Sequence, residues 1–181
     1  MADDPIDAGD YRAAETLKDG TAVLIRGIRP DDAAAVAAGF EHFGPESRHH
    51  RFFAAKAALT AEELERVTHP ETENALRLVA QVIEGLDAGR LVGGASCIVD
   101  PAADPERGEI AFSIIDPYQG RGLGARLLRH LAALARERGI RSFTATVLPE
   151  NAAMLAVFEK SGLPMERESE GEHLRVALSL A

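Results

Sequence analysis

A glycine-rich turn, Gln119-Gly120-Arg121-Gly122-Leu123-Gly124, stands between an apolar run and a helical run. Residues 110–115 predict a buried strand, and residues 125–138 predict an amphipathic helix with leucines on one face. A strand, a turn with three alternating glycines and a helix bring free backbone N–H groups to the positive end of a helix dipole. The sequence therefore predicts a phosphate-binding turn.

Two common nucleotide-binding motifs do not fit this turn. The dinucleotide fingerprint needs a glycine where this chain has Ala125, and an acidic residue at the end of the next strand. The triphosphate loop needs a Gly-Lys-Ser/Thr sequence, which is absent here. The backbone amides would bind a pyrophosphate of another cofactor class, with added charge from Arg121 or Arg126.

The composition fits one globular domain. The chain has 181 residues, of which 46% are hydrophobic and 27% charged, and its net charge is −9. Residues 1–12 are polar and predict a flexible N-terminal extension, so we expect a single domain over residues 13–181. The acidic balance argues against nucleic acid as a partner and is compatible with cationic partners, such as amines or lysine-rich protein segments, although solubility alone would also account for it.

Cys97 is the single cysteine. One cysteine excludes an intrachain disulfide and a cysteine-based metal site, and the histidines lack metal-ligand spacing, so no metal is expected. No apolar run approaches the ~20 residues of a membrane span. The acidic N-terminus lacks a signal-peptide pattern. These features predict a cytoplasmic protein without a membrane partner.

The order of expected elements defines the fold class. A hairpin, a set of helices and three antiparallel strands precede the glycine turn, and helix, strand, helix and two strands follow it. This order predicts a mixed α/β fold, close to α+β, with a central, mostly antiparallel twisted sheet of about six to seven strands and about four to five helices. We expect a bulge at Gly93-Gly94 and a final hairpin loop over residues 169–172.

Two motifs resemble those of the GNAT superfamily of N-acetyltransferases. The turn, as Gln119-x-x-Gly122-x-Gly124, resembles the family's acyl-CoA-binding motif. A second stretch, from Asn151 through Phe158 to Gly162-Leu163, resembles the helix that follows it. The element order matches over nearly the whole chain. The resemblance implies the GNAT fold, acetyl-CoA as cosubstrate and direct transfer of acetyl to an amine, and by analogy a possible homodimer through late strands.

The resemblance also implies which residues bind acetyl-CoA. They lie at the end of one strand, in the turn and in the second motif: Ile114, Ile115, Gln119, Gly120, Arg121, Gly122, Leu123, Gly124, Ala125, Asn151 and Phe158. A backbone N–H near Ile114 would bind the thioester oxygen. Asn151 would hold the pantetheine arm or a water, cap its helix, or do both. Phe158 stands where many relatives have a tyrosine acid, so the thiolate would take its proton from water or leave unprotonated.

Several stretches resemble, more narrowly, the acetyltransferase domain of Pat-type bacterial protein-lysine acetyltransferases. They are residues 25–32, 44–48, 51–53, 59–60 and 147–155. This resemblance implies a protein lysine as acceptor. Two alternatives stay open: acetylation of a small amine, such as a polyamine, an antibiotic or an amino acid, and a module that senses acyl-CoA without turnover.

Glu109 is the candidate general base. A lysine amine has a pKa of about 10.4 and is almost fully protonated at neutral pH, so a base must take its proton. In the Pat group a glutamate at the start of the strand before the turn has this role, and Glu109 has that position. Strand alternation places it on one face with Ala111 and Ser113. The alternatives are a merely solvated carboxylate and the loop residue Glu106 as base. Arg51 either has a structural role or contacts CoA or the acceptor.

Overall fold

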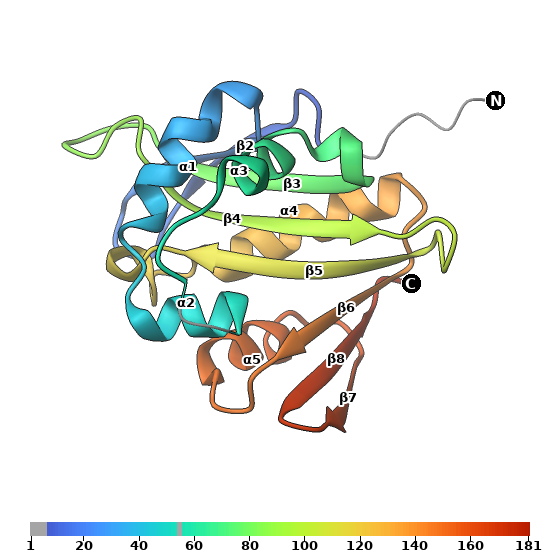
Figure 1. The fold of residues 1–181 in the computed structure, drawn as a ribbon. Helices are drawn as coiled ribbons and strands as arrows, with labels where there is room; N and C mark the ends of the chain where they lie inside the picture. Colours follow the sequence, from blue (N-terminus) through green and yellow to red (C-terminus); the bar gives the residue numbers. More distant parts are fainter. Residues whose placement is uncertain (1–6, 54–55) are drawn as a thin grey trace.

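The computed structural model describes residues 7–53 and 56–181 and is built on one eight-stranded sheet of order β1-β2-β3-β4-β5-β6-β8-β7 (Figure 1). The strands are β1 (Arg12–Thr16), β2 (Ala22–Gly27), β3 (Ala75–Val82), β4 (Leu91–Val99), β5 (Arg107–Ile114), β6 (Ser142–Val147), β7 (Met165–Glu170) and β8 (His173–Ser179). The α-helices are α1 (Ala33–Phe40), α2 (Pro45–Phe52), α3 (Ala61–Thr68), α4 (Leu123–Glu137) and α5 (Ala152–Glu159).

The mixed, mostly antiparallel sheet confirms the predicted fold class. Every neighbouring pair of strands is antiparallel except β5 and β6, which run parallel. The sheet has eight strands rather than the expected six to seven, because the hairpins at both ends of the chain, β1–β2 and β7–β8, are fully paired into it. No helix in the described part of the chain is long and apolar enough to cross a membrane.

Helices cover both faces of the sheet. Figure 1 shows α4 behind β3 and β4, α1 and α3 in front of them, and α2 beside β5. The leucine stripe of α4, with Leu127 and Leu131 at 0% exposure, packs into the main core. Each such leucine contributes about 1.5–3 kcal/mol of burial free energy. The opposite face, beneath α1 to α3, holds a much smaller apolar cluster around Ile28, Val79 and Leu91.

Local sequence signals set several element boundaries. The capping box at α3 is formed: Thr60 Oγ1 accepts from the Glu63 N–H at 3.1 Å, and Glu63 Oε2 accepts from the Thr60 N–H at 2.8 Å. Gly20 turns the first hairpin with a φ of 89°, and Gly139 ends α4 with a φ of 80°. Both residues adopt the left-handed conformation that only glycine takes without strain.

Three details differ from the sequence predictions. The irregularity in β4 falls at Val92, one residue before the expected Gly93-Gly94, because Ala80 pairs with Gly93 and Gln81 with Leu91. The last hairpin loop is shorter than residues 169–172, because β7 extends to Glu170. Residues 1–6 lie outside the described residues, and Ala8, within the expected extension, is buried at 4% exposure.

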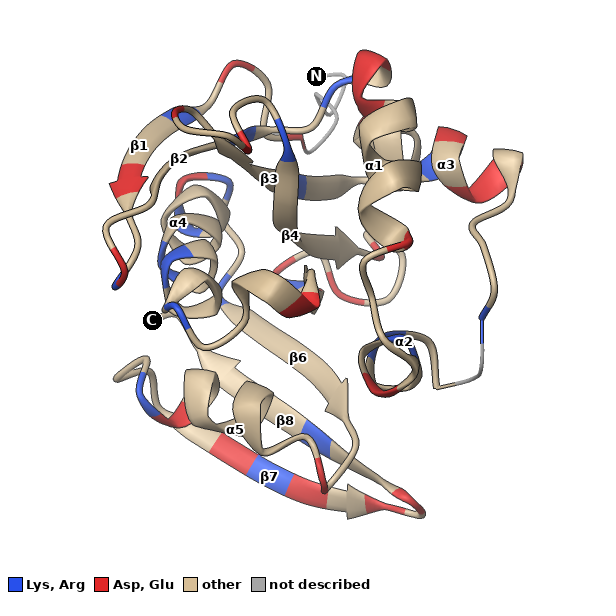
Figure 2. Ribbon diagram, turned by 90° about the vertical axis from the view of Figure 1, so that its left-hand side faces the viewer, with Lys and Arg blue, Asp and Glu red and all other residues tan. Residues whose placement is uncertain are grey.

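Strand β7 forms one edge of the sheet. Figure 2 shows acidic and basic residues alternating along it, and these residues, Glu166 to Glu170, are exposed. Charged side chains on an edge strand oppose pairing with a further strand, so this edge is protected against aggregation.

A buried ion pair fixes the start of α1 to β2. Arg26 donates from both terminal nitrogens to the Asp32 carboxylate at 2.8 Å, and the Arg29 N–H donates to the same carboxylate at 2.8 Å. Asp32 is 7% exposed. Burial alone would raise the pKa of Asp32, but the hydrogen bonds and charge of Arg26 outweigh burial and lower the pKa below its ordinary value.

We predict that Asp32→Asn destabilises the protein at neutral pH and much less in acid. A depressed carboxyl pKa gives stability that is present above the unfolded-state pKa of about 3.9 and is lost as pH falls through the folded-state pKa. Removing one partner of a buried pair costs about 3 kcal/mol. Urea unfolding at pH 7 and pH 3 measures the difference. The exposed neighbour Asp31→Asn is the control, and an equal loss at both pH values would contradict the prediction.

Candidate active site

Strands β5 and β6 pair over three residues and then diverge. The parallel register joins Arg107 to Ser142, Gly108 to Phe143 and Glu109 to Thr144, and ends there. Beyond Glu109 a cleft of about 100 Å³ opens between the two strands. It is lined by residues from β5, β6, α2 and α5, including Glu109, Phe112, Thr146, Asn151 and Phe158.

The open edge of β5 presents free backbone N–H groups to this cleft. The Ile115 N–H donates to the Val92 carbonyl at 3.1 Å. Hydrogen bonding alternates along an antiparallel strand, so the N–H groups of Ile114 and Phe112 point the other way, toward β6. The Ile114 carbonyl, on that same side, accepts from the Gln119 side chain at 3.0 Å. The predicted N–H at Ile114 thus faces the open side of β5, away from β4, whereas the Ile115 N–H is bonded to β4.

The glycine turn leads from β5 into α4 with its amides unpaired. Gly120 and Gly122 have φ values of 72° and 83°. Gly122 is the N-cap of α4 and gives the helix no side-chain cap. Among the described residues, the N–H groups of residues 120–125 have no hydrogen-bond acceptor. The turn therefore has the free donors that an anion requires.

Neighbouring side chains fix this turn in place. Gln119 donates to Ser47 Oγ at 3.0 Å as well as to the Ile114 carbonyl. Asp116 accepts from Ser47 Oγ at 2.7 Å and from the Gly44 N–H at 3.0 Å. The Gln119 side chain is thus occupied within the protein, and it joins the turn to the start of α2.

Two predicted cations lie at the turn, each beside a carboxylate. Arg121 bonds Asp19 at 2.7 Å and stacks over the Tyr118 ring, and Arg126 donates to the Gly122 carbonyl at 3.0 Å, with Glu15 3.3 Å away. These pairs lie where the first hairpin reaches the turn.

Sequence reasoning missed Lys18 at this same place. A Cβ atom on Gly122 would lie 3.2 Å from Lys18 Cε and 2.7 Å from Arg126 Nη1. The only signal in the sequence was Lys18-Asp19-Gly20, which predicts a hairpin turn and says nothing about a contact with Gly122.

Close packing explains the other residues predicted around the helix start. Leu123 is in the core at 1% exposure, and Ala125 is exposed on the first turn of α4. Gly124 lies against α5, since a Cβ there would approach Val157 Cγ2 to 3.2 Å. These three residues offer the site their backbone rather than their side chains.

Glu109 is an exposed carboxylate at the point where the strands separate, and it lines the cleft. Helix α2 contributes His50, Arg51 and Phe53 to the same cleft. The rival carboxylate, Glu106, lies in the preceding loop beside Arg141, at 3.2 Å. The structure thus brings Glu109, and not Glu106, to the cleft.

The second motif forms the far wall of the cleft. Asn151 caps α5, because its Oδ1 accepts from the Met154 N–H at 3.2 Å. Phe158 is buried and meets Phe112 edge to face, with ring centroids 6.1 Å apart.

The single cysteine, Cys97, is buried in the core. Burial raises the pKa of the Cys97 thiol to about 12, so Cys97 is not a thiolate at neutral pH.

Comparisons with known proteins agree with this geometry. The profile of the acetyltransferase (GNAT) family matches residues 41–163. Acetyltransferase PA5475 of Pseudomonas aeruginosa is 34% identical over 142 residues, which cover 77% of this chain and 74% of that protein. Acetyltransferase Pat of Mycolicibacterium smegmatis is 29% identical over 155 residues, which cover 86% of this chain but 45% of that protein.

A solved structure has the same fold. The GNAT domain of S. lividans PAT superposes with a TM-score of 0.84 at 33% identity, over 93% of this chain and 96% of that one. This chain belongs to the GNAT family of acetyltransferases.

Proposed function

We propose that this acetyltransferase moves acetyl from acetyl-CoA directly to an amine nitrogen, with Glu109 as general base. One observation carries the proposal: Glu109 lines the same cleft as the unpaired N–H edge of β5. A base and an oxyanion-binding donor on one strand, at the site where the strand separates from its neighbour, are what direct acyl transfer requires.

The donor would lie along the turn and the cleft. The amides of residues 120–125 and the positive end of α4 would bind the pyrophosphate. Lys18, Arg121 and Arg126 would add positive charge there. The pantetheine arm would enter between β5 and β6, past Asn151, and place the thioester at the N–H groups of Phe112 and Ile114.

Each step of the transfer then has a group in this chain. Glu109 takes a proton from the ammonium form of the acceptor, and the free amine attacks the thioester carbonyl. The N–H of Ile114 stabilises the oxyanion that forms. The oxyanion re-forms the carbonyl as the carbon–sulfur bond breaks, and CoA leaves as the thiolate, since Phe158 has no hydroxyl to protonate it. The second proton of the attacking nitrogen passes to solvent, which leaves a neutral amide.

Two acceptor classes have separate support. A protein lysine is the acceptor implied by the resemblance to Pat-type enzymes, and a cytoplasmic location would fit it. One structural observation favours a small amine. The face of β5 that carries Ala111 and Ser113 borders a cavity beneath α1 to α3, which could hold a small acceptor.

We predict that Glu109→Gln lowers kcat by about 10²–10⁴-fold, because the amide cannot accept the proton of the ammonium group. Release of CoA thiol with a panel of amines and lysine peptides measures the rate. Glu106→Gln is the matched control and should keep full activity. Unchanged activity of Glu109→Gln at neutral pH would remove Glu109 as base. Tight CoA binding with no thiol release for any amine would favour the non-catalytic module.

We also predict that Gly122→Ala weakens CoA binding about tenfold, a change of about 1.4 kcal/mol. Alanine at this φ is strained by about 1–2 kcal/mol, and its Cβ would collide with Arg126 at the phosphate turn. Calorimetric titration with CoA measures the affinity.

Gly139→Ala provides the matched control for this change. Gly139 has nearly the same φ, 80°, at the other end of α4, and a Cβ there meets no atom within 4 Å. Both variants should lose similar stability, and only Gly122→Ala should lose affinity. Equal CoA affinities in the two variants would contradict the role of the turn.

A further inference from the structure

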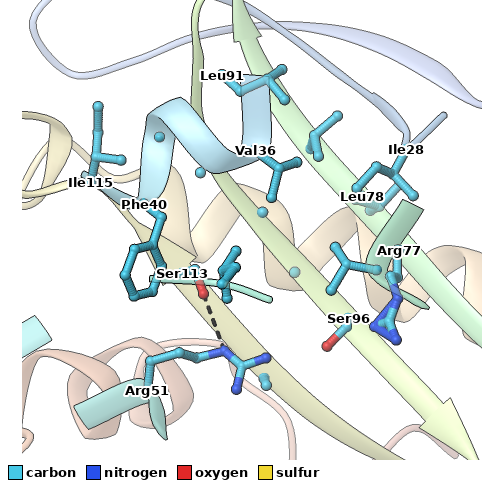
Figure 3. A pocket seen from close by; sticks show the side chains of 18 of the residues that line it. Ile28, Val36, Phe40, Arg51, Arg77, Leu78, Leu91, Ser96, Ser113 and Ile115 are labelled. Carbon is cyan, nitrogen blue, oxygen red and sulfur yellow. Dashed lines mark hydrogen bonds between the residues drawn. The ribbon is translucent and has the colours of Figure 1, made fainter. Parts of the chain in front are cut away.

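A cavity of about 150 Å³ lies between α1 to α3 and the sheet (Figure 3). One water needs roughly 10–15 Å³ by the same measure, so the cavity has room for a small molecule. Most of its lining is apolar and comes from residues such as Ile28, Val36, Phe40, Leu91 and Ile115. Its polar lining is restricted to Arg51, Arg77, Ser96 and Ser113.

Arg51 enters this cavity from α2 and also lines the cleft with Glu109. Its Nε donates to Ser113 Oγ at 3.1 Å, and its two terminal nitrogens have no hydrogen-bond partner within residues 7–53 and 56–181. Burial and the charge of Arg77 lower the pKa of Arg51 from its ordinary value, while Glu109 opposes them. Arg51 is thus a guanidinium with unused donors, placed between the cavity and the candidate base.

Arg77 meets the cavity from β3. It is 6% exposed, and one terminal nitrogen pairs with Glu73. Its Nε is buried and has no hydrogen-bond partner in the described part of the chain. A buried donor without a partner costs about 1–3 kcal/mol, more when the group is charged. Figure 3 shows Ser96 between the guanidinium groups of Arg51 and Arg77.

This arrangement lacks an anion. Two guanidinium groups repel each other in a cavity with mostly apolar walls. Glu73 pairs with Arg77, whereas Glu109 acts on Arg51 through its charge alone, with no ion pair between them among the described residues. A carboxylate that accepts from both would remove the repulsion and satisfy the open donors, because guanidinium donors match carboxylate geometry. The apolar remainder of the cavity would hold an aliphatic or aromatic group.

We infer that Arg51 and Arg77 form a carboxylate site that selects an apolar α-amino acid as acceptor. The carboxylate would lie between the arginines, the amine would face Glu109 and the side chain would fill the apolar cavity. The inference rests on the proposed amine acetylation and names the chemistry of its small-amine candidate. A carboxylate on the acyl group of the donor, as in succinyl-CoA, could bind the same two arginines. The test below distinguishes a carboxylate on the acceptor from one on the donor.

The test compares acceptors that differ only in the carboxylate: leucine, leucinamide and 3-methylbutylamine, each with acetyl-CoA. The wild-type protein should prefer leucine by about 10- to 100-fold in kcat/KM, the value of a charged hydrogen-bonded contact. Arg51→Gln and Arg77→Gln should raise the KM for leucine by the same factor and remove the preference for leucine over the other two acceptors. Arg51→Lys should restore part of the loss. Arg107→Gln, an exposed arginine beside Asp104, is the control.

A second arm measures binding without catalysis. Calorimetric titration with 4-methylpentanoate, which is leucine without its amine, should show binding that Arg51→Gln abolishes. Thermal unfolding checks that each variant folds. Should Arg77→Gln unfold, Arg51→Gln carries the test, because Arg51 is only partly buried.

The outcomes separate this inference from the proposed function. Equal kcat/KM for leucine and 3-methylbutylamine, or transfer to peptide lysines but not to leucine, would overturn the carboxylate site and leave amine acetylation standing. If Arg51→Gln raises the KM for succinyl-CoA and not the KM for leucine, the site binds a carboxylate on the acyl donor. That result would overturn the inference. Binding of 4-methylpentanoate without transfer to any amine would uphold the site and overturn the proposed function.

Discussion

The candidate active site depends on the short pairing between strands β5 and β6. Strand β5 holds β6 for three residues, Arg107 to Glu109, and then the two strands separate. Unpaired N–H groups inside a protein are costly, so a sheet that opens in its middle needs a ligand or water at the opening. Glu109 is the last paired residue of β5 on this side, so it lies at the point where the cleft begins. The divergence of β5 from β6 therefore accounts for two features at once: the unpaired N–H groups at the proposed donor site and the position of Glu109 beside the cleft.

A small network of polar side chains fixes the glycine turn and helix α2 in place around this opening. Asp116 and Gln119 both bond Ser47, which ties the phosphate turn to the first turn of α2. At the other end of that helix, Arg51 bonds Ser113 on β5. Helix α2 is thus fixed at both ends to the segment that carries the donor site. The proposed CoA site at the turn and the position of Arg51 in the cleft are thus linked through one short helix.

The sequence was sufficient for features set by local chemistry and insufficient for those set by tertiary contact. The glycine turn, the capping box at Thr60 and the position of Glu109 on its strand follow from residue type and spacing, and the sheet architecture followed from the element order. The contact of Lys18 with Gly122 and the meeting of Arg51 with Arg77 join residues far apart in the chain, so no periodicity reports them. His130 shows the same limit: its place in mid-helix predicts a surface residue, yet it bonds Tyr11 and Glu15 from the first hairpin.

The net charge of the chain is negative, whereas the charged residues of the proposed carboxylate site, Arg51 and Arg77, are positive. The net charge of −9 is compatible with cationic partners, such as lysine-rich segments, and is equally explained by solubility. Charges on the surface act through solvent and are screened within about 8 Å at physiological salt. Arg51 and Arg77 act at contact distance in a cavity with few polar atoms, where a charge has a far larger effect on binding. In the proposed reaction, Arg51 and Arg77 would therefore contribute more to the choice of acceptor than the acidic surface around them.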